Sequence, residues 1–240
     1  MIFCGTTYSK NHNDSIPWAT GKGKDDWEAE KLIALARELQ PGIIIDNRTE
    51  IEQDIWTPEQ IQPTEWVRHP ETGELVSWEA CQTFSGSWGY YRDEMTWKSP
   101  KMLIEMLVKT VSTGGNFIIN VGPTARGDFD YRANNALDIY KDFMKYNSRS
   151  IYGSTFTNEF IGPNGTVISK NRELNRIYIH MFEIPYKVLH IKSLGPYIKY
   201  AQILRDASEL TYTINGDDVI FDIPVTLKND IDIVIEVFLK

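Results

Sequence analysis

The feature that most constrains this chain is an alternation of helical and strand patterns that stops well before the chain ends. Residues 25–40 and 98–112 carry apolar residues at helical spacing. Each stretch is followed, after a break that contains glycine, by a short apolar run, at 43–45 and at 116–121. A further helix is expected at about 130–147. Strands that alternate with helices predict parallel βα units whose strands are buried.

Beyond residue 153 the helical spacing disappears, and short β-branched or aromatic runs are separated by turn signals such as Asn164-Gly165. Runs of this kind predict an antiparallel β-sandwich. We therefore expect an α/β chain of two domains, residues 1–153 and residues 154–240. The expected strands of the second domain are 166–169, 176–182, 188–191, 201–204, 211–214, 219–223 and 231–238.

The first domain is too short for a closed (β/α) barrel, which takes about 250 residues. An incomplete barrel would leave strand edges exposed and its core unfilled. The sequence therefore predicts a partial (β/α) barrel of the TIM type, followed by a C-terminal antiparallel β-sandwich. We also expect the chain to be a truncated product, with the earlier barrel strands encoded upstream of Met1.

The amino-acid composition indicates which binding partners and which cellular compartment are expected for this chain. The chain has 25 Lys and Arg against 33 Asp and Glu, a formal net charge of −8, which argues against nucleic acid or an anionic membrane as a partner. No apolar run approaches the roughly 20 residues that span a bilayer. Cys4, Cys81 and the four histidines have neither disulfide-framework nor metal-site spacing, so no metal is expected. As written, without a signal peptide, the chain is expected to be cytoplasmic.

Three segments are candidate sources of functional side chains, because barrel sites are built at the carboxyl ends of strands and in the loops that follow. The first is the Asp-Asn-Arg sequence at 46–48. The second is the loop at 54–60, which contains Glu59. The third is the segment at 78–90, where aromatic, carboxylate and glycine residues alternate.

Several of these segments resemble the family 29 α-L-fucosidases. Residues 78–90 are similar to the family's Trp-Glu…Ser-Trp-Gly-Tyr segment, and 114–123 to its Gly-Gly-Asn…Gly-Pro signature. Residues 21–27, 46–48 and 150–153 also fit family motifs. Because these separate segments occur in the family's order over nearly the whole chain, the resemblance is specific.

The resemblance implies a retaining enzyme that hydrolyses terminal α-L-fucosides of oligosaccharides or glycoconjugates, on a (β/α) barrel with an appended β-domain. In such an enzyme two carboxylates about 5–5.5 Å apart flank the sugar, one as nucleophile and the other as acid/base. A fucosylated glycan is the implied partner, and no metal or organic cofactor is implied. Full-length relatives would be secreted or lysosomal.

Carried over residue by residue, the resemblance makes Glu59 the acid/base, Arg48 a substrate-contacting arginine and Trp88 an aromatic wall beside the fucose C6 methyl group. Glu79 is the rival acid/base and a substrate-binding candidate. Each has an ordinary alternative. Glu59 could be a solvated loop glutamate and Arg48 part of a structural ion pair. Trp88 could be a core ring, and Glu79 a carboxylate satisfied by neighbouring donors.

The nucleophile is missing from the place where the family has it. Aligning Tyr8 with the last aromatic residue of the family's motif puts Gly5 where the aspartate belongs. Asp14 is the nearest carboxylate, and it is a weak nucleophile candidate because its neighbours are those of a loop. The expected protein is therefore an α-L-fucosidase chain with impaired activity.

Other interpretations stay open at this point. The chain could be a non-catalytic carbohydrate-binding or structural fragment, although no Trp follows residue 154 to build a sugar platform. It could also be a glycosidase of another specificity on the same barrel, since the upstream residues that grip fucose are absent. A second copy of the chain or a complementing N-terminal fragment would be its protein partner.

Overall fold

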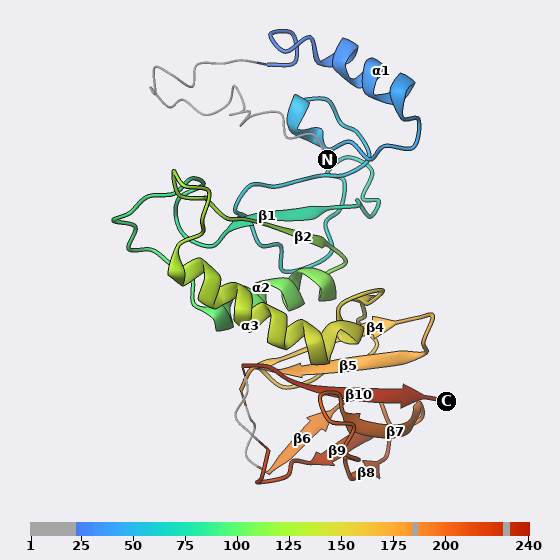
Figure 1. Cartoon of the computed structure of the whole chain (residues 1–240). Helices are drawn as coiled ribbons and strands as arrows, with labels where there is room; N and C mark the ends of the chain where they lie inside the picture. Colours follow the sequence, from blue (N-terminus) through green and yellow to red (C-terminus); the bar gives the residue numbers. More distant parts are fainter. Residues whose placement is uncertain (1–22, 184–186, 228–230) are drawn as a thin grey trace.

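A computed structural model describes residues 23–183, 187–227 and 231–240 of the chain. Figure 1 shows successive tiers: helix α1 at one end, a pair of strands with two long helices in the middle, and a β-rich part that contains the C-terminus. Within the described residues no helix is both long and apolar enough to cross a bilayer.

The three expected helices are confirmed. They are α1 (Ala29–Leu39), α2 (Pro100–Ser112) and α3 (Tyr131–Asn147), with short 3₁₀ turns η1 (Asn47–Thr49) and η2 (Ser148–Ser150). The Ser99 hydroxyl caps α2 by accepting from the Met102 amide, with Pro100 at the first helical position. Gly114, in the left-handed region at φ +79°, follows the end of that helix. The Asp130 carboxylate caps α3 by accepting from the Arg132 amide.

The middle tier is a layer of parallel segments. Strands β1 (Glu79–Thr83) and β2 (Asn116–Asn120) pair in parallel along their full length. On the other side of β1, isolated parallel bridges join Trp56 to Trp78 and Glu59 to Cys81, and a further bridge joins Asp46 to Ile55. The order across the layer is therefore the segment at 46, the segment at 55–59, β1 and β2. Apolar side chains of β2, α2 and α3 pack together around Phe84, Leu103 and Ala136.

The expectation of a buried strand at 43–45 is wrong. This run forms no strand, and Ile44 is 64% exposed. A short apolar run becomes a buried strand only when neighbours pair with its edges and cover its faces. Among the described residues, the one β-bridge next to this run is the parallel bridge between Asp46 and Ile55. Strand β2 is also half-buried rather than buried, since β1 is its one partner among the described strands.

The β-rich part contains all seven expected strands. A five-stranded antiparallel sheet has the order β3 (Thr155–Phe156), β4 (Thr166–Asn171), β5 (Arg176–Met181), β10 (Ile233–Leu239) and β7 (Ile198–Ile203). A three-stranded antiparallel sheet has the order β6 (Val188–Ile191), β9 (Asp218–Asp222) and β8 (Tyr212–Asn215). One cluster of buried apolar side chains from both sheets, which includes Ile179, Ile235 and Phe221, fills the space between them.

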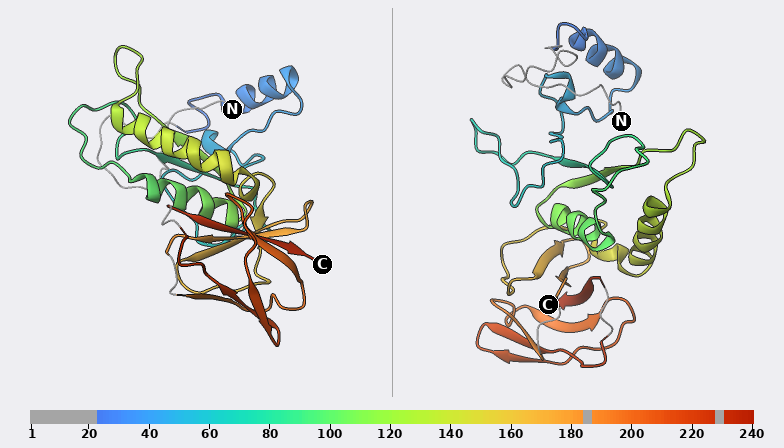
Figure 2. Two further views of the ribbon diagram at one scale, coloured as in Figure 1. Left: turned by 60° about the horizontal axis from the view of Figure 1, so that its bottom comes forward. Right: turned by 90° about the vertical axis from the view of Figure 1, so that its left-hand side faces the viewer.

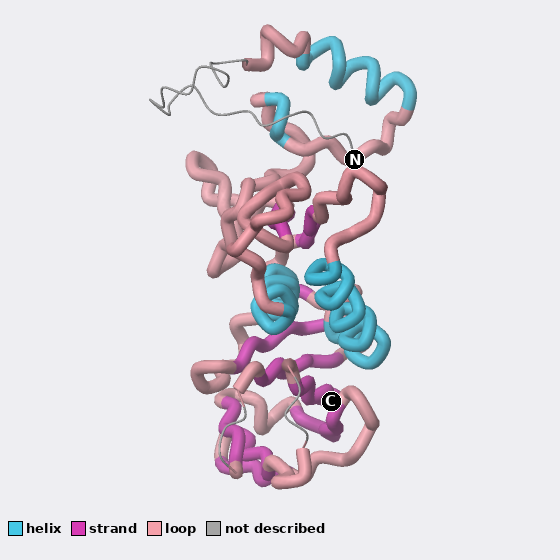
Figure 3. The backbone as a smooth tube through the Cα atoms, turned by 60° about the vertical axis from the view of Figure 1, so that its left-hand side comes forward, coloured by secondary structure: helices cyan, strands magenta, loops and turns pink. Residues whose placement is uncertain are grey.

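Helices α2 and α3 lie between the parallel layer and the β-rich part, as the three further views show (Figures 2 and 3). Ile104 and Val108 of α2 and Phe143 of α3 form a buried cluster with Ile151 and Phe182. The ammonium group of Lys101 adds a 2.9 Å hydrogen bond to the Phe182 carbonyl oxygen. Helices α2 and α3 therefore pack against both the parallel layer and the β-rich part.

The face of β5 and β10 that points away from the sandwich core carries buried polar side chains. His180 Nδ1 lies 2.6 Å from Asp232 Oδ2, and both side chains are almost fully buried. Further along, Glu236 accepts from Gln202 at 2.7 Å and pairs with Arg149 at 3.1 Å. These contacts satisfy groups that would be costly to bury alone.

Candidate active site

The candidate site is built where three neighbouring parallel segments bring polar side chains together. Arg48 lies in η1, directly after the segment at 46, and its backbone amide donates to the Asp46 carboxylate at 3.1 Å. The next segment is tied to the same turn, because the Thr57 amide donates to Asn47 Oδ1 at 2.9 Å. Local hydrogen bonds thus fix the turn that presents Arg48 to Glu59.

Arg48 and Glu59 form the central contact of the site. Arg48 Nη1 donates to Glu59 Oε2 at 2.8 Å. The arginine side chain is 9% exposed and the glutamate side chain 32% exposed. A charge-assisted bond from a buried guanidinium orients the carboxylate, and the remaining exposure lets a ligand reach it. Such a carboxyl group can donate a proton to a bound molecule when it is protonated and accept one when it is ionised.

Glu79 lies deeper in the same layer. Because Glu59 is bridged to Cys81, Glu79 is two residues closer to the N-terminal ends of the strands, about 6–7 Å further in. Burial raises the pKa of the Glu79 carboxyl, the nearby Asp46 carboxylate raises it further, and Arg48 opposes the rise. Glu79 is therefore a buried acid beneath the Arg48–Glu59 pair.

Trp88 is carried by the loop that follows β1, which we call the rim loop (residues 85–97). The backbone oxygen of Trp88 accepts from Asn120 Nδ2, at the end of β2, at 2.5 Å. Its side chain is half-buried. The parallel register pairs Asn120 with Thr83, so the rim loop leaves the layer at the carboxyl ends of both strands.

The structure thus brings Arg48, Glu59 and Glu79 together and places Trp88 in the adjoining loop. Asp14 and Gly5, the two positions considered for the nucleophile, lie outside the described residues. Asn120 was not among the residues singled out from sequence. Its place at the end of an expected strand was the signal that could have identified it.

Comparisons with known proteins show which family the chain resembles. The family model described as alpha-L-fucosidase matches residues 6–149 of the chain. The alpha-L-fucosidase of Dictyostelium discoideum is 33% identical over 110 residues, which are 45% of this chain and 24% of that protein. The plasma alpha-L-fucosidase of Homo sapiens is 34% identical over 103 residues, which are 40% of this chain and 22% of that protein. The chain therefore covers well under half the length of these relatives.

Solved structures extend the likeness to most of the chain. Alpha-L-fucosidase isoenzyme 1 from Paenibacillus thiaminolyticus has a TM-score of 0.81 and 29% identity, covering 90% of this chain and 54% of that chain. An alpha-L-fucosidase from Bacteroides thetaiotaomicron has a TM-score of 0.77 at 21% identity, covering 90% of this chain and 53% of that chain. The second likeness concerns the fold alone.

Proposed function

Because this chain belongs to the α-L-fucosidase family, we propose that it supplies the acid/base half of a retaining α-L-fucosidase site. The observation that carries the proposal is the Arg48–Glu59 contact at the carboxyl ends of neighbouring parallel segments. In this role Glu59 protonates the glycosidic oxygen as the bond to the anomeric carbon breaks, and then accepts a proton from the attacking water.

The other candidate residues have supporting roles in this proposal. Arg48 holds the Glu59 carboxylate and faces the sugar hydroxyl groups, and Trp88 provides the apolar wall for the C6 methyl group of fucose. Glu79 lies beneath Arg48, where its carboxyl oxygens can accept a hydrogen bond from the guanidinium, and burial raises the pKa of this carboxyl group. The substrate class is a terminal α-L-fucoside on an oligosaccharide or glycoconjugate.

We also propose that residues 1–153 are part of a (β/α) barrel and that residues 154–240 are a separate β-sandwich domain. The run of parallel segments beside α2 and α3 supports this division. A groove of about 920 Å³ lies beside the exposed Ile44 and is lined by Phe117 and Leu107, among others. A complementing N-terminal barrel segment would cover these groups, and the activity of this chain alone is therefore impaired.

The test separates binding from turnover. A fucose-configured iminocyclitol, which is cationic and imitates the sugar, should bind the chain and bind Glu59→Gln at least about tenfold more weakly, because the carboxylate charge is gone. Glu65→Gln, at an exposed position on the same connection, is the matched control and should bind like the parent. No binding, or equal binding by all three proteins, would contradict the assignment of Glu59.

Hydrolysis of an aryl α-L-fucoside is the second measurement. We expect little or no turnover by this chain alone. Turnover close to that of an intact family member would contradict the proposed impairment, and Asp14→Ala would then show whether Asp14 is the nucleophile. A non-catalytic glycan-binding fragment is the second candidate function, and it is favoured by an exposed aromatic surface beside the site.

A further inference from the structure

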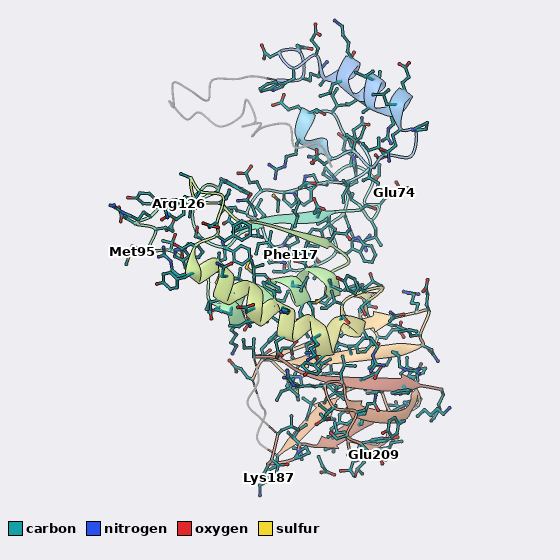
Figure 4. All side chains as sticks on the ribbon, in the orientation of Figure 1. Glu74, Met95, Phe117, Arg126, Lys187 and Glu209 are labelled. Carbon is teal, nitrogen blue, oxygen red and sulfur yellow. The ribbon has the colours of Figure 1, made fainter. Side chains whose placement is uncertain are left out.

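The exposed surface is formed by four large side chains, three on the rim loop and one at the start of α3, and we call it the rim patch: Tyr90, Tyr91, Met95 and Tyr131. Their exposed fractions run from 41% for Tyr90 to 88% for Met95. Three of them belong to the rim loop, and Tyr131 follows the loop after β2. Figure 4 labels Met95 and Arg126 at the same end of the parallel layer, opposite Glu74. The patch thus lies at the end where Trp88 is carried.

The rim loop is held in one shape by hydrogen bonds at its base. The Lys98 ammonium group donates to the backbone oxygens of Thr83 at 2.7 Å and Ser85 at 3.3 Å. The Lys98 amide also donates to the Phe84 oxygen at 2.9 Å, so the two ends of the loop are joined. A loop closed in this way displays its side chains at fixed positions without a core of its own.

A buried carboxylate holds the middle of the loop. Glu94 accepts from the Ser87 hydroxyl at 2.5 Å and from the amide of Thr96 at 2.7 Å. These hydrogen bonds, that of Ser87 first, lower the pKa of Glu94 to about 2. The carboxylate is therefore ionised and bonded across the whole ordinary pH range.

Arg132 and Gly122 connect the rim loop to the loop between β2 and α3. Arg132 Nη1 donates to the Glu94 carbonyl oxygen at 2.9 Å, and its guanidinium lies 4.6 Å from the Trp97 ring centre and 5.5 Å from the Tyr131 ring centre. A Cβ atom at Gly122 would lie 2.3 Å from the Gly89 carbonyl carbon. The backbones of the two loops are thus in direct contact, and Tyr131 is fixed relative to the rim loop.

Four of the charged side chains beside the patch form two ion pairs. Arg92 Nε donates to Asp93 at 2.8 Å, and Arg132 Nε donates to Asp130 at 2.8 Å. Together with the bonded Glu94, these pairs leave little net charge for an ionic ligand. Tyrosine rings and hydroxyl groups suit a neutral ligand with both an apolar face and many hydroxyl groups, which is the chemistry of a pyranose.

We propose that the rim patch binds the non-fucose sugars of a fucosylated glycan, the part that leaves with the glycosidic oxygen. This inference rests on the proposed function, because it places the patch beside the residues that would cleave the fucosyl bond. Tyr91 and Tyr131 provide the stacking faces and Met95 covers the edge of the sugar. The patch then selects oligosaccharides over simple aryl fucosides.

The test measures binding of an unfucosylated N-acetyllactosamine tetrasaccharide by saturation-transfer NMR. Tyr91→Ala and Tyr131→Ala should each weaken binding about fivefold, the loss expected for one aromatic contact. Both side chains are exposed, so the variants fold. Tyr152→Ala, at an exposed tyrosine beyond the C-terminal end of α3, is the matched control and should change the affinity less than twofold.

The iminocyclitol measured in parallel separates the two proposals. Its binding should be unchanged in Tyr91→Ala and Tyr131→Ala. Tetrasaccharide binding through the patch without iminocyclitol binding would contradict the proposed function and leave the patch in place. Absence of tetrasaccharide binding by the parent, or binding by both tyrosine variants as tight as that of the parent, would overturn the patch. So would a concentration-dependent dimer that Tyr91→Ala and Tyr131→Ala both disrupt, since the patch would then be an interface between copies.

Discussion

Arg48 and Glu59 meet across 2.8 Å although they belong to different segments of the parallel layer. The guanidinium is buried and the carboxylate is partly open to solvent. An acid/base held in this way has its orientation set by the protein interior and its reactive side facing outward. The contact therefore matters both for stability and for the chemistry proposed for the site.

Replacement of the arginine should be costly. Arg48→Met is expected to lower the free energy of unfolding by about 2 kcal/mol, because a charge-assisted hydrogen bond in a buried setting is lost. Arg92→Met is the control, since Arg92 is 80% exposed in its pair with Asp93, and it should cost less than about 1 kcal/mol. Urea unfolding of the three proteins checks this, and equal midpoints would contradict it.

Removal of the Glu79 charge should stabilise the protein at neutral pH. The folded state raises the pKa of this carboxyl above its ordinary value of 4.5, chiefly by burial. The folded state then binds more protons than the unfolded state above pH 4.5, so stability is lost as the pH rises. Glu79→Gln should therefore be more stable than the parent at pH 7 and match it below about pH 4. A stability difference that grows on acidification would contradict the assignment.

The contact between the rim loop and the loop after β2 predicts the effect of one added methyl group. Gly122→Ala should lower the free energy of unfolding by about 2 kcal/mol, because the new Cβ meets backbone atoms of Gly89 and Tyr90 that cannot rotate away. Gly42→Ala is the matched control, since a Cβ there meets nothing within 4 Å. Thermal unfolding of both variants distinguishes them. Equal melting temperatures would show that the loops separate readily.

The two histidine–aspartate contacts of the sandwich should contribute very differently to the free energy of unfolding. His180→Ala is expected to cost about 3 kcal/mol, because it opens a cavity and leaves buried Asp232 without its partner. His190→Ala should cost less than about 1 kcal/mol, since His190 is half exposed in its 2.9 Å contact with Asp218. Chemical unfolding checks both values, and a similar loss in the two variants would contradict this account.

The sandwich strands could be predicted from sequence because short β-branched or aromatic runs are separated by turn signals, although β5 and β10 prove to be buried on both faces. Strand β1 was not predicted, since its sequence Glu-Ala-Cys-Gln-Thr has no apolar alternation. Its polar side chains are buried on both faces, where Gln82 and Thr83 donate hydrogen bonds to the backbone oxygens of Ile61 and Ser85. The run at 43–45 shows the reverse case, because it is apolar and yet forms no strand with the other described residues, which leaves Ile44 exposed.

The candidate site could be predicted only in outline. Sequence places Arg48 and Glu59 eleven positions apart, and no local pattern shows that they touch. The roles expected for these two residues were inferred from the family resemblance. Their contact results from the parallel order of the segments that carry them. The depth of Glu79 relative to Glu59 depends on strand register, which a single sequence does not determine.

The sharing of α2 and α3 between the two parts has a practical consequence for recombination and domain swapping. Their packing against Phe182 leaves an apolar surface on both sides of any cut made at Gly153. Chimeras joined at that glycine should aggregate, and a crossover ahead of Pro100 would instead separate β1 and Phe84 from the strand and helices that they contact. Homologous chains should therefore exchange the two helices only together with the surfaces on both of their sides.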